Sequence, residues 1–443
     1  MKVDPVRDAA VGILLQVFER GAYLNIALDK TLERRPLSER GRRFLAQLVY
    51  GTVRAKLLCD HVLAHRVEQP LEGLPRPILA ILRMGVFQSL YCNQVPHPAM
   101  VNTSVDLARK YGHAGTARLV NAVLRRVPQR MEEVRLPDPQ EDRAGYLSIR
   151  YSMPCWLVER WLKEHGPAEA ESLCAAYDRQ APVTIRANTL RTSPEDLANK
   201  LTALGWTVKP LSPIPDAIEI LDGPAPARSK LFREGLFIVE DAASMLPPHL
   251  LEPRAGERVL DLCAAPGVKT THLAQIADGL AHVAAMDVHP GKLRLVRENA
   301  ARLGAPGVST VCGDGARPPL APGFDRVLVD APCSGLGTLR RRPDLKWRTT
   351  PDLPARIALT QRSLLRSAIE VCKNGGVIVY SVCTFSPEET DDVVEACLAE
   401  RNVAPEDGQD WLSPWRISRG RYRTDPRQAG LDGFFLMRLR KAS

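Results

Sequence analysis

The sequence predicts a multidomain protein: an all-α N-terminal domain, a small α+β module, and a C-terminal Rossmann-like α/β domain with a doubly wound sheet. Its 443 residues, 45% apolar and 25% charged, are typical of a globular chain with two or three domains. Apolar residues recur at helical spacing through the first 130 positions, with no alternating segment among them. From about residue 236, strand-like runs alternate with helix-like segments, as in a parallel sheet covered by helices.

The first domain, residues 1–130, is expected to be a compact helical domain, with its clearest helical spacing at residues 44–53, 79–90 and 119–127. It holds 20 Lys and Arg against 10 Asp and Glu, an excess of +10, whereas the whole chain carries +9. An excess concentrated in one domain suggests a polyanionic partner, most often nucleic acid, although a solvated basic surface would give the same pattern. Much of the charge is arginine: Arg34, Arg35, Arg40, Arg42, Arg43, Arg125 and Arg126.

The middle of the chain is predicted to form a linker and a small module. Residues 131–145 combine acidic side chains with two prolines, which indicates a solvated linker. Residues 146–235 are expected to form the α+β module. Its predicted elements are a helix at 156–162, an alternating segment at 183–190, a helix capped by Ser193 and ended by Gly205, and β-like pieces at 217–221 and 236–239.

The C-terminal domain, residues 236–443, carries the clearest alternation of strands and helices. Ligands of such sheets bind at the carboxyl ends of the strands, so the residues that follow each strand are the candidate site. The strand-like runs are 259–262, 282–286, 310–312, 327–329 and 377–379, and helix-like segments lie near 270–276, 291–303 and 352–371.

Composition excludes several classes of protein. Ten cysteines are too few for a disulfide scaffold of this length, and no C-x-x-C pair signals a zinc ribbon or a thioredoxin-type site. Reduced thiols in a cytoplasmic protein are the simpler expectation. No apolar run approaches the roughly 18 residues of a membrane helix, so no membrane partner is expected. The nine histidines are scattered, and the sequence predicts no metal site.

The first strand-like run leads into Asp-Leu-Cys-Ala-Ala-Pro-Gly-Val-Lys-Thr, residues 261–270. Small residues in a turn let backbone amides approach a ligand at the start of a helix, and Lys269 adds a cation. The turn is neither the G-x-G-x-x-G fingerprint nor a P-loop. It suggests another cofactor, one that carries a carboxylate and a ribose.

Two further aspartates follow the next two strands. Asp287 can accept hydrogen bonds from ribose hydroxyls, and Asp314 from an adenine amino group or the amine of the cofactor. Any one aspartate at a strand end is more often a helix cap or a turn residue. Their order after the 261–270 turn favours the cofactor-binding interpretation.

The fourth strand leads into Asp330-Ala-Pro-Cys-Ser-Gly335 and the fifth into Tyr380-Ser-Val-Cys-Thr384, so Cys333 and Cys383 stand at the ends of adjacent strands. Carbon 5 of cytosine is a poor nucleophile, but a thiolate that adds to carbon 6 makes an enamine that can attack a sulfonium methyl group. A base must then remove the carbon-5 proton so that the thiol can leave. Asp330 could stabilise charge at ring nitrogen 3.

These motifs resemble those of the bacterial RNA 5-methylcytosine methyltransferases of the Sun/Fmu (RsmB) type, and the resemblance covers nearly the whole chain. The motifs are residues 261–267, 330–335, 341–347, 380–389 and 433–435. The resemblance implies S-adenosylmethionine-dependent methylation of carbon 5 of a cytosine in 16S ribosomal RNA. It also implies a NusB-like RNA-binding first domain and an RNA-recognition-like module that contains Arg186 and Asn188.

The resemblance also implies roles for individual residues. Cys383 is the nucleophile and Cys333 assists product release; in the analogous DNA enzymes the Pro-Cys cysteine attacks instead, so this assignment rests on the family. Asp330 completes the catalytic set. The residues expected to hold the cofactor are Cys263, Ala264, Ala265, Pro266, Gly267, Val268, Lys269, Asp287, Asp314 and Asp330. The chain departs from the family at Val268, usually glycine, and at Val382, usually threonine.

The sequence leaves open how the RNA is contacted and whether the substrate is ribosomal RNA. The basic residues around Trp347, from Arg340 to Arg348, are expected to contact RNA phosphates while the indole stacks on a base; a solvated basic loop with a buried Trp is the alternative. A cytosine in a loop or bulge of the RNA is the expected target, because it leaves its stack most cheaply. A transfer RNA cytosine methyltransferase is the first alternative, and a non-catalytic RNA-binding assembly factor is the second. The second would need neither thiol.

Overall fold

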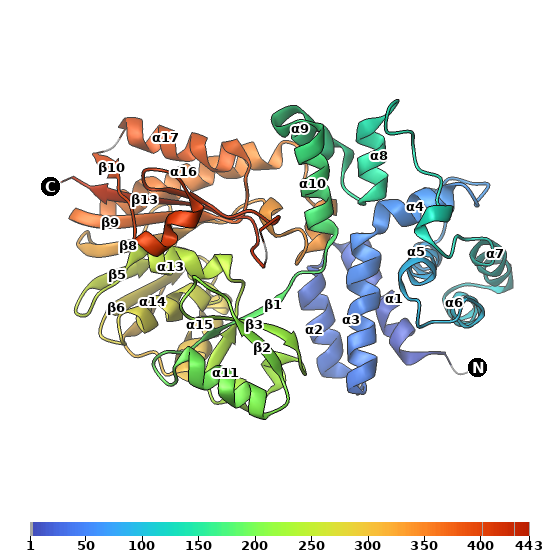
Figure 1. Ribbon diagram of the computed structural model, residues 1–443, viewed down its shortest axis with the longest axis horizontal. Coiled ribbons are helices and arrows are strands. Elements are labelled where there is room, and N and C mark those ends of the chain that lie inside the picture. Colours follow the sequence, from blue (N-terminus) through green and yellow to red (C-terminus); the bar gives the residue numbers. More distant parts are fainter. Residues whose placement is uncertain (1–2, 401, 429, 443) are drawn as a thin grey trace. The chain divides into compact units, whose positions relative to one another are not determined.

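The computed structural model describes residues 3–400, 402–428 and 430–442. The chain forms two compact units (Figure 1). Unit 1 comprises Met1–Gln180 with Leu339–Pro351, and unit 2 comprises Ala181–Thr338 with Asp352–Ser443. The first boundary thus lies inside the range 146–235 that the sequence suggested as one module, because three helices of that range belong to unit 1.

Unit 1 is helical, as the sequence predicts. Its first helix begins after Asp4, whose carboxylate accepts from the amides of Val6 and Arg7, and ends at Gly21 in the left-handed conformation. The helices of unit 1 are α1 (Pro5–Arg20), α2 (Leu24–Arg34), α3 (Glu39–Arg54), α4 (Lys56–Ala64), α5 (Arg76–Tyr91), α6 (His97–Tyr111), α7 (Ala114–Leu124), α8 (Arg143–Arg150), α9 (Cys155–His165) and α10 (Pro167–Asp178), with short 3₁₀ turns η1 (Leu71–Gly73), η2 (Met131–Glu133) and η6 (Pro343–Trp347).

The core of unit 1 lies on the apolar faces that the helical spacing predicts. Leu45, Leu48 and Val53 on α3 are fully buried. Gly51 on the same helix allows close approach of α5, because a Cβ at this position would overlap the ring of Phe87. Most of the predicted arginine set is on the surface: Arg34, Arg35, Arg40, Arg43, Arg125 and Arg126 are exposed, and Arg42 is half-buried.

Residues 339–351 fold into unit 1, and this overturns the expected role of Trp347. Its indole Nε1 donates to the carbonyl of Val53 at 2.7 Å, and the ammonium of Lys56 lies 4.9 Å from the ring centroid. Lys346 is buried and donates to the carbonyl of Ser152. Arg340 is buried as well. The prediction that Lys346 and Arg340 face an RNA was therefore wrong, since both are buried; Trp347 is half-buried, with its N–H bonded inside unit 1.

Unit 2 begins with a four-stranded antiparallel sheet in the order β2-β3-β1-β4. Its strands are β1 (Val183–Ala187), β2 (Thr207–Pro210), β3 (Ala217–Asp222) and β4 (Phe237–Val239), with helices α11 (Pro194–Ala203) and α12 (Lys230–Arg233) and the turn η3 (Pro226–Arg228). This confirms the predicted α+β composition. The sequence missed β2 because its four residues are mostly exposed and lack an apolar alternation.

The rest of unit 2 is built on a nine-stranded sheet, in the order β11-β12-β13-β9-β8-β5-β6-β7 with β10 beside β13. The strands are β5 (Arg258–Asp261), β6 (His282–Asp287), β7 (Val308–Cys312), β8 (Phe324–Asp330), β9 (Cys372–Val382), β10 (Val403–Pro405), β11 (Arg416–Ser418), β12 (Arg421–Arg423) and β13 (Phe435–Lys441). The five predicted strands are present and parallel.

The sheet is mixed rather than wholly parallel, because β13 runs antiparallel to β9 over six residue pairs. The sequence missed this strand because three basic residues interrupt its apolar run. Arg438 is nevertheless buried, and its guanidinium pairs with Glu406 at 2.9 Å.

Helices cover both faces of this sheet, as a doubly wound fold requires (Figure 1). Neighbouring strand residues point to opposite faces: Val259 packs with α13 and α14, and Leu260 packs with α16. The elements are α13 (Leu246–Leu251), α14 (Val268–Ile276), α15 (Pro290–Leu303), α16 (Leu353–Val371) and α17 (Asp391–Glu400), with the turns η4 (Ala243–Met245), η5 (Leu336–Thr338), η7 (Pro387–Glu389) and η8 (Asp410–Trp415). Among the described residues, no helix is long and apolar enough to span a membrane.

Candidate active site

The predicted site residues follow the carboxyl ends of the five parallel strands, which meet at one edge of the sheet. The β5 turn (residues 263–269) follows β5, and Asp287 ends β6. Asp330 ends β8 and is followed by the β8 turn (residues 331–335). The β9 turn (residues 383–386) follows β9.

The β5 turn is held close to its neighbours through backbone groups. Gly267 precedes α14 with a φ of +94°, and a Cβ there would lie 2.8 Å from the Cα of Val296 on α15. The side-chain amide of Asn299 donates to the backbone carbonyl of Pro266 at 3.0 Å. The backbone amide of Ala264 donates to the backbone carbonyl of Met286 at 2.8 Å. Glycine is therefore required where the turn contacts α15, and the turn presents backbone at the start of a helix.

The two departures from the family pattern leave these contacts intact. Val268 accepts a hydrogen bond from Arg186 through its carbonyl, and its side chain is half-buried. Val382 is fully buried in the apolar layer beneath α16, so its methyl groups pack where a hydroxyl would need a partner.

Asp287, the last residue of β6, and Asp314, which follows β7, both accept hydrogen bonds from backbone amides. Asp287 accepts from the amide of His289 at 2.9 Å and from the amide of Ala265 at 3.3 Å, and it is half-buried. Asp314 accepts from the amide of Ala316 at 2.9 Å and is exposed. An ionised carboxylate accepts about four hydrogen bonds, so each has capacity left for a ligand.

Asp261 lies beneath the site and not in it. Its side chain is buried, and the hydroxyl of Thr270 donates to it at 2.7 Å. Burial, reinforced by the nearby charge of Asp330, raises the pKa of Asp261 to about 7.

Lys269 connects the β5 turn with β8. Its ammonium donates to Asp330 at 2.7 Å and to the hydroxyl of Ser244 at 2.9 Å, and Ser381 donates to the other oxygen of Asp330 at 2.8 Å. Burial opposes the charge on Lys269, but Asp330 and Glu240 outweigh it, and the pKa of Lys269 is raised. Asp330 thus accepts two hydrogen bonds, one of them charge-assisted.

Cys333 and Cys383 are in contact, with their Sγ atoms 3.1 Å apart. The hydrogen bond to Cys383, together with burial, raises the pKa of Cys333 well above its ordinary value. The charges near the two thiols differ in sign. The negative carboxylate of Glu389 helps to raise the pKa of Cys333, whereas the positive ammonium of Lys269 interacts with Cys383. This arrangement favours a proton on Cys333.

Arg186 and Asn188 point into unit 2 and not toward a ligand. Arg186 is buried, pairs with Glu240, and donates to the carbonyl of Val268 at 2.9 Å. Asn188 donates to the carbonyls of Gly235 and Leu303. Arg186 thus joins the small sheet to α14 and Asn188 joins it to α15, which an alternating sequence pattern does not reveal.

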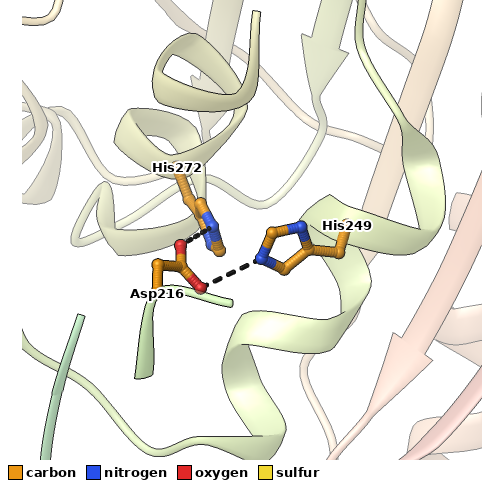
Figure 2. A group of neighbouring side chains, drawn as sticks. All are labelled: Asp216, His249 and His272. Carbon is orange, nitrogen blue, oxygen red and sulfur yellow. Dashed lines mark hydrogen bonds and ion pairs between the residues drawn. The ribbon is translucent and has the colours of Figure 1, made fainter. Parts of the chain in front are cut away.

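No local pattern of the sequence indicates the cluster of Asp216, His249 and His272, whose ligand-type atoms lie within 4.8 Å of one another (Figure 2). Oδ1 of Asp216 is 3.0 Å from Nε2 of His249, and Oδ2 is 2.7 Å from Nε2 of His272. Gln275 also donates to Oδ2. Burial, and then the charge of Arg186, lower the pKa of His272 to about 3.

The Asp216 cluster joins three elements that are distant in the sequence. Asp216 precedes β3, His249 lies on α13, and His272 lies on α14, the helix that the β5 turn opens. Because one carboxylate faces both imidazoles and the amide of Gln275, we interpret the cluster as a polar brace for α14.

A doubly wound sheet with a small-residue turn after its first strand and carboxylates after the next two defines a Rossmann-like S-adenosylmethionine-dependent methyltransferase. The described residues fit this cofactor: the β5 turn presents backbone amides, and Asp287 and Asp314 retain acceptor capacity. The chain belongs to the RsmB/F family of 16S ribosomal RNA methyltransferases, and it is an rRNA methyltransferase.

Three family descriptions match the chain. "16S rRNA methyltransferase RsmB/F" matches residues 248–440, the NusB family matches residues 4–129, and the ferredoxin-like domain of RsmF/B-like methyltransferases matches residues 153–227. The all-α first domain is therefore a NusB domain, as the sequence predicts.

Curated relatives match over their full length. Proteins named probable ribosomal RNA small subunit methyltransferase B are 36% identical in Synechocystis sp. (98% of this chain, 99% of the relative) and 34% identical in Bacillus subtilis (100% of both). Ribosomal RNA small subunit methyltransferase B of Thermus thermophilus is 36% identical over 100% of this chain and 99% of its own.

Solved structures share the fold. The crystal structure of PH0851 matches with a TM-score of 0.84 and 26% identity over 100% of both chains. A methyltransferase homologue from Pyrococcus horikoshii matches with a TM-score of 0.59 and 28% identity, over 69% of this chain and 100% of its own.

Proposed function

We propose that this protein transfers a methyl group from S-adenosylmethionine to carbon 5 of a cytosine in 16S ribosomal RNA, through a covalent bond between Cys383 and carbon 6. The observation that carries the proposal is the contact of two thiols, 3.1 Å apart, at the ends of β8 and β9. They belong to the same edge of the sheet as the β5 turn and the Lys269–Asp330 pair.

In the proposed reaction the Cys383 thiolate adds to carbon 6, and carbon 5 becomes nucleophilic. The bound cofactor supplies an electrophilic sulfonium methyl group. The addition pushes charge to ring nitrogen 3, which takes up a proton from solvent, and Asp330 is assigned to accept a hydrogen bond from this N–H. Loss of the carbon-5 proton then restores the ring double bond and expels the Cys383 thiolate, and Cys333 is assigned to this release step.

The cofactor is proposed to contact the β5 turn through its carboxylate end and the strand-end aspartates through its nucleoside. The residues assigned to it are Cys263, Ala264, Ala265, Pro266, Gly267, Val268, Lys269, Asp287, Asp314 and Asp330. The positive end of the α14 dipole and the amides of the turn favour a bound carboxylate. The acceptor capacity of Asp287 suits ribose hydroxyls.

The proposed substrate is a cytosine in a loop or bulge of 16S ribosomal RNA. The names of the relatives support ribosomal RNA over transfer RNA. The exposed arginines of unit 1 supply cations for phosphate contacts. Reaction through a thiolate needs reduced cysteines, and no disulfide joins the cysteines of the described residues; a cytoplasmic setting is part of the proposal. A pure assembly factor would not need two thiols in contact.

The test is transfer of labelled methyl from S-adenosylmethionine to protein-free 16S ribosomal RNA, followed by nucleoside analysis. Transfer RNA and the Cys383→Ala variant are the controls. We expect label in 5-methylcytosine, in ribosomal RNA only, and only with Cys383 present. Label in transfer RNA alone would favour the first alternative. Absence of label from the RNA and from assembled small subunits would favour a binding factor.

A further inference from the structure

One buried carboxylate lies between the two cysteine turns. Glu389, at the end of η7, is fully buried. Its Oε1 accepts from the backbone amide of Ser334 at 2.8 Å and from the side-chain amide of Gln361 at 3.1 Å. Its Oε2 accepts from the hydroxyls of Ser334 and Thr384. Four donors from three elements therefore converge on one side chain.

These donors adjoin the thiols in the chain. Ser334 directly follows Cys333, and Thr384 directly follows Cys383, so Glu389 bonds to the next residue in each turn. The hydroxyls of Ser334 and Thr384 are themselves 3.1 Å apart. Besides the contact of the two thiols, the β8 and β9 turns are thus connected through the carboxylate of Glu389, which brings the two hydroxyls together.

The carboxylate is itself held in place. Gln361 on α16 also donates to the carbonyl of Pro332, which precedes Cys333, at 2.9 Å. Tyr380 near the end of β9 donates to the carbonyl of Glu389 at 2.7 Å. A buried carboxylate is costly unless several donors satisfy it, and here three of the four donors come from the turns that carry the thiols and the fourth from Gln361 on α16.

We propose that Glu389 is a positioning residue that sets the separation of the Cys333 and Cys383 thiols by joining their two turns. The proposal rests on the proposed function for its catalytic consequence, since Cys383 is assigned to bond carbon 6 and Cys333 to release the same adduct. Their relative position must then be fixed in advance, and a displacement of about 1 Å can cost about 100-fold in rate.

A role that depends on the length of the Glu389 side chain and a role that depends on its charge predict different behaviour of the variants. Glu389→Gln keeps the length: its carbonyl oxygen can accept from Ser334 and Gln361, and its amide can donate to the two hydroxyls. Glu389→Asp keeps the charge but is one methylene shorter and cannot reach both turns. If Glu389 positions the turns, glutamine is tolerated and aspartate is not.

Methylation kinetics provide the first measurement. We expect Glu389→Asp and Glu389→Ala to lower kcat about 100-fold while the KM for S-adenosylmethionine changes less than about 3-fold. Glu389→Gln should stay within about 5-fold of wild type in kcat. Glu395→Gln, on exposed α17, is the matched control and should behave as wild type. A Glu389→Gln variant as slow as Glu389→Ala would overturn the proposal, because charge would then matter and not length.

The second measurement needs no RNA and no methylation activity. Diamide takes up the two electrons and two protons that a pair of thiols loses on forming a disulfide, so its rate of cross-linking Cys333 to Cys383 reports their separation. We expect wild type and Glu389→Gln to cross-link at equal rates, and Glu389→Asp at least about 10-fold more slowly. Peptide mass spectrometry identifies the bridge, and thermal melting checks that each variant is folded.

The two measurements distinguish the positioning role from the proposed reaction. Folded Glu389→Asp that cross-links at the wild-type rate would refute the positioning role, whatever its activity. Slow cross-linking in Glu389→Asp, together with a wild type that methylates no cytosine, would leave the positioning role standing and refute the proposed function.

Discussion

The cofactor side and the cysteine side of the site are built in different ways. The cofactor side consists of the backbone of the β5 turn and of two carboxylates at the surface, each held by backbone amides. The cysteine side consists of side chains that bond to one another: the two half-buried thiols, the buried Glu389, and the residues that Glu389 joins.

This difference reflects what each side must do. A cofactor-binding surface needs shape and acceptors, which backbone and solvated carboxylates provide. A pair of reacting groups needs a fixed separation and controlled protonation, which a buried hydrogen-bonded network provides. Substitutions on the cofactor side should therefore change the affinity for S-adenosylmethionine, and substitutions on the cysteine side should change kcat.

The largest effect is expected at Cys383. Cys383→Ala should lower kcat more than about 1000-fold, because no other thiol can replace the bond to carbon 6. Binding of S-adenosylmethionine, measured by calorimetry, should stay within about 2-fold of wild type. Cys155→Ala, at an exposed cysteine of unit 1, is the control. Substantial residual methylation by Cys383→Ala would place the nucleophile elsewhere.

The second-largest effect is expected at Cys333, and it distinguishes the role of this thiol from that of Cys383. Cys333→Ala should still form the bond between Cys383 and the RNA, but should release it slowly, so a covalent protein–RNA adduct accumulates. The adduct is measured as an RNA-dependent shift on a denaturing gel, and it should be absent in the double variant that also lacks Cys383. Wild-type turnover without any adduct would contradict a release role for Cys333.

The cofactor side should respond in affinity alone. Asp287→Asn removes the ionised acceptor assigned to the ribose, and we expect S-adenosylmethionine to bind about 10-fold more weakly. At saturating cofactor, kcat should stay within about 3-fold of wild type. Asp222→Asn, at an exposed position on β3, is the control. A large fall in kcat with unchanged cofactor binding would break the distinction between the two sides.

The smallest effect concerns stability and its pH dependence at Asp261. Its pKa is raised from 3.8 to about 7, so the protonated form favours the folded state. This contribution is fully present below about pH 3.8 and is lost as the pH rises through 7. Asparagine stays neutral, so the stability of Asp261→Asn relative to wild type should rise between pH 5 and pH 8, on the order of a few kcal/mol.

Urea unfolding at the two pH values measures this difference, with Asp222→Asn as the control. The reverse trend, with Asp261→Asn losing stability relative to wild type as the pH rises, would show that the buried carboxylate is stabilising when charged.

The fold and the strand-end positions were accessible from the sequence because they depend on local patterns. Apolar periodicity predicted the helices of unit 1 and the five parallel strands, and short motifs after those strands marked the β5 turn and the cysteines. The contact of Cys333 with Cys383 followed from the adjacency of two strands, which the order of a doubly wound sheet predicts.

The remainder depends on which distant segments meet, and no local pattern encodes that. The basic residues around Trp347 resemble a solvated RNA-binding loop, but Trp347 and Lys346 are bonded inside unit 1. Glu389 stood in the sequence as part of a motif without an assigned task, because its partners lie 55 and 28 positions away at Ser334 and Gln361. Asp216 and its histidines are similarly far apart.

The measurement that tests the central claim most directly identifies the atom bonded to the RNA. A 16S ribosomal RNA transcript that contains 5-fluorocytidine is incubated with the enzyme and S-adenosylmethionine. Fluorine at carbon 5 cannot leave as a proton does, so the covalent intermediate persists and can be digested for peptide mass spectrometry. We predict that the nucleotide is attached to Cys383. Attachment to Cys333, or methylation of ordinary RNA without any trapped peptide, would contradict the mechanism.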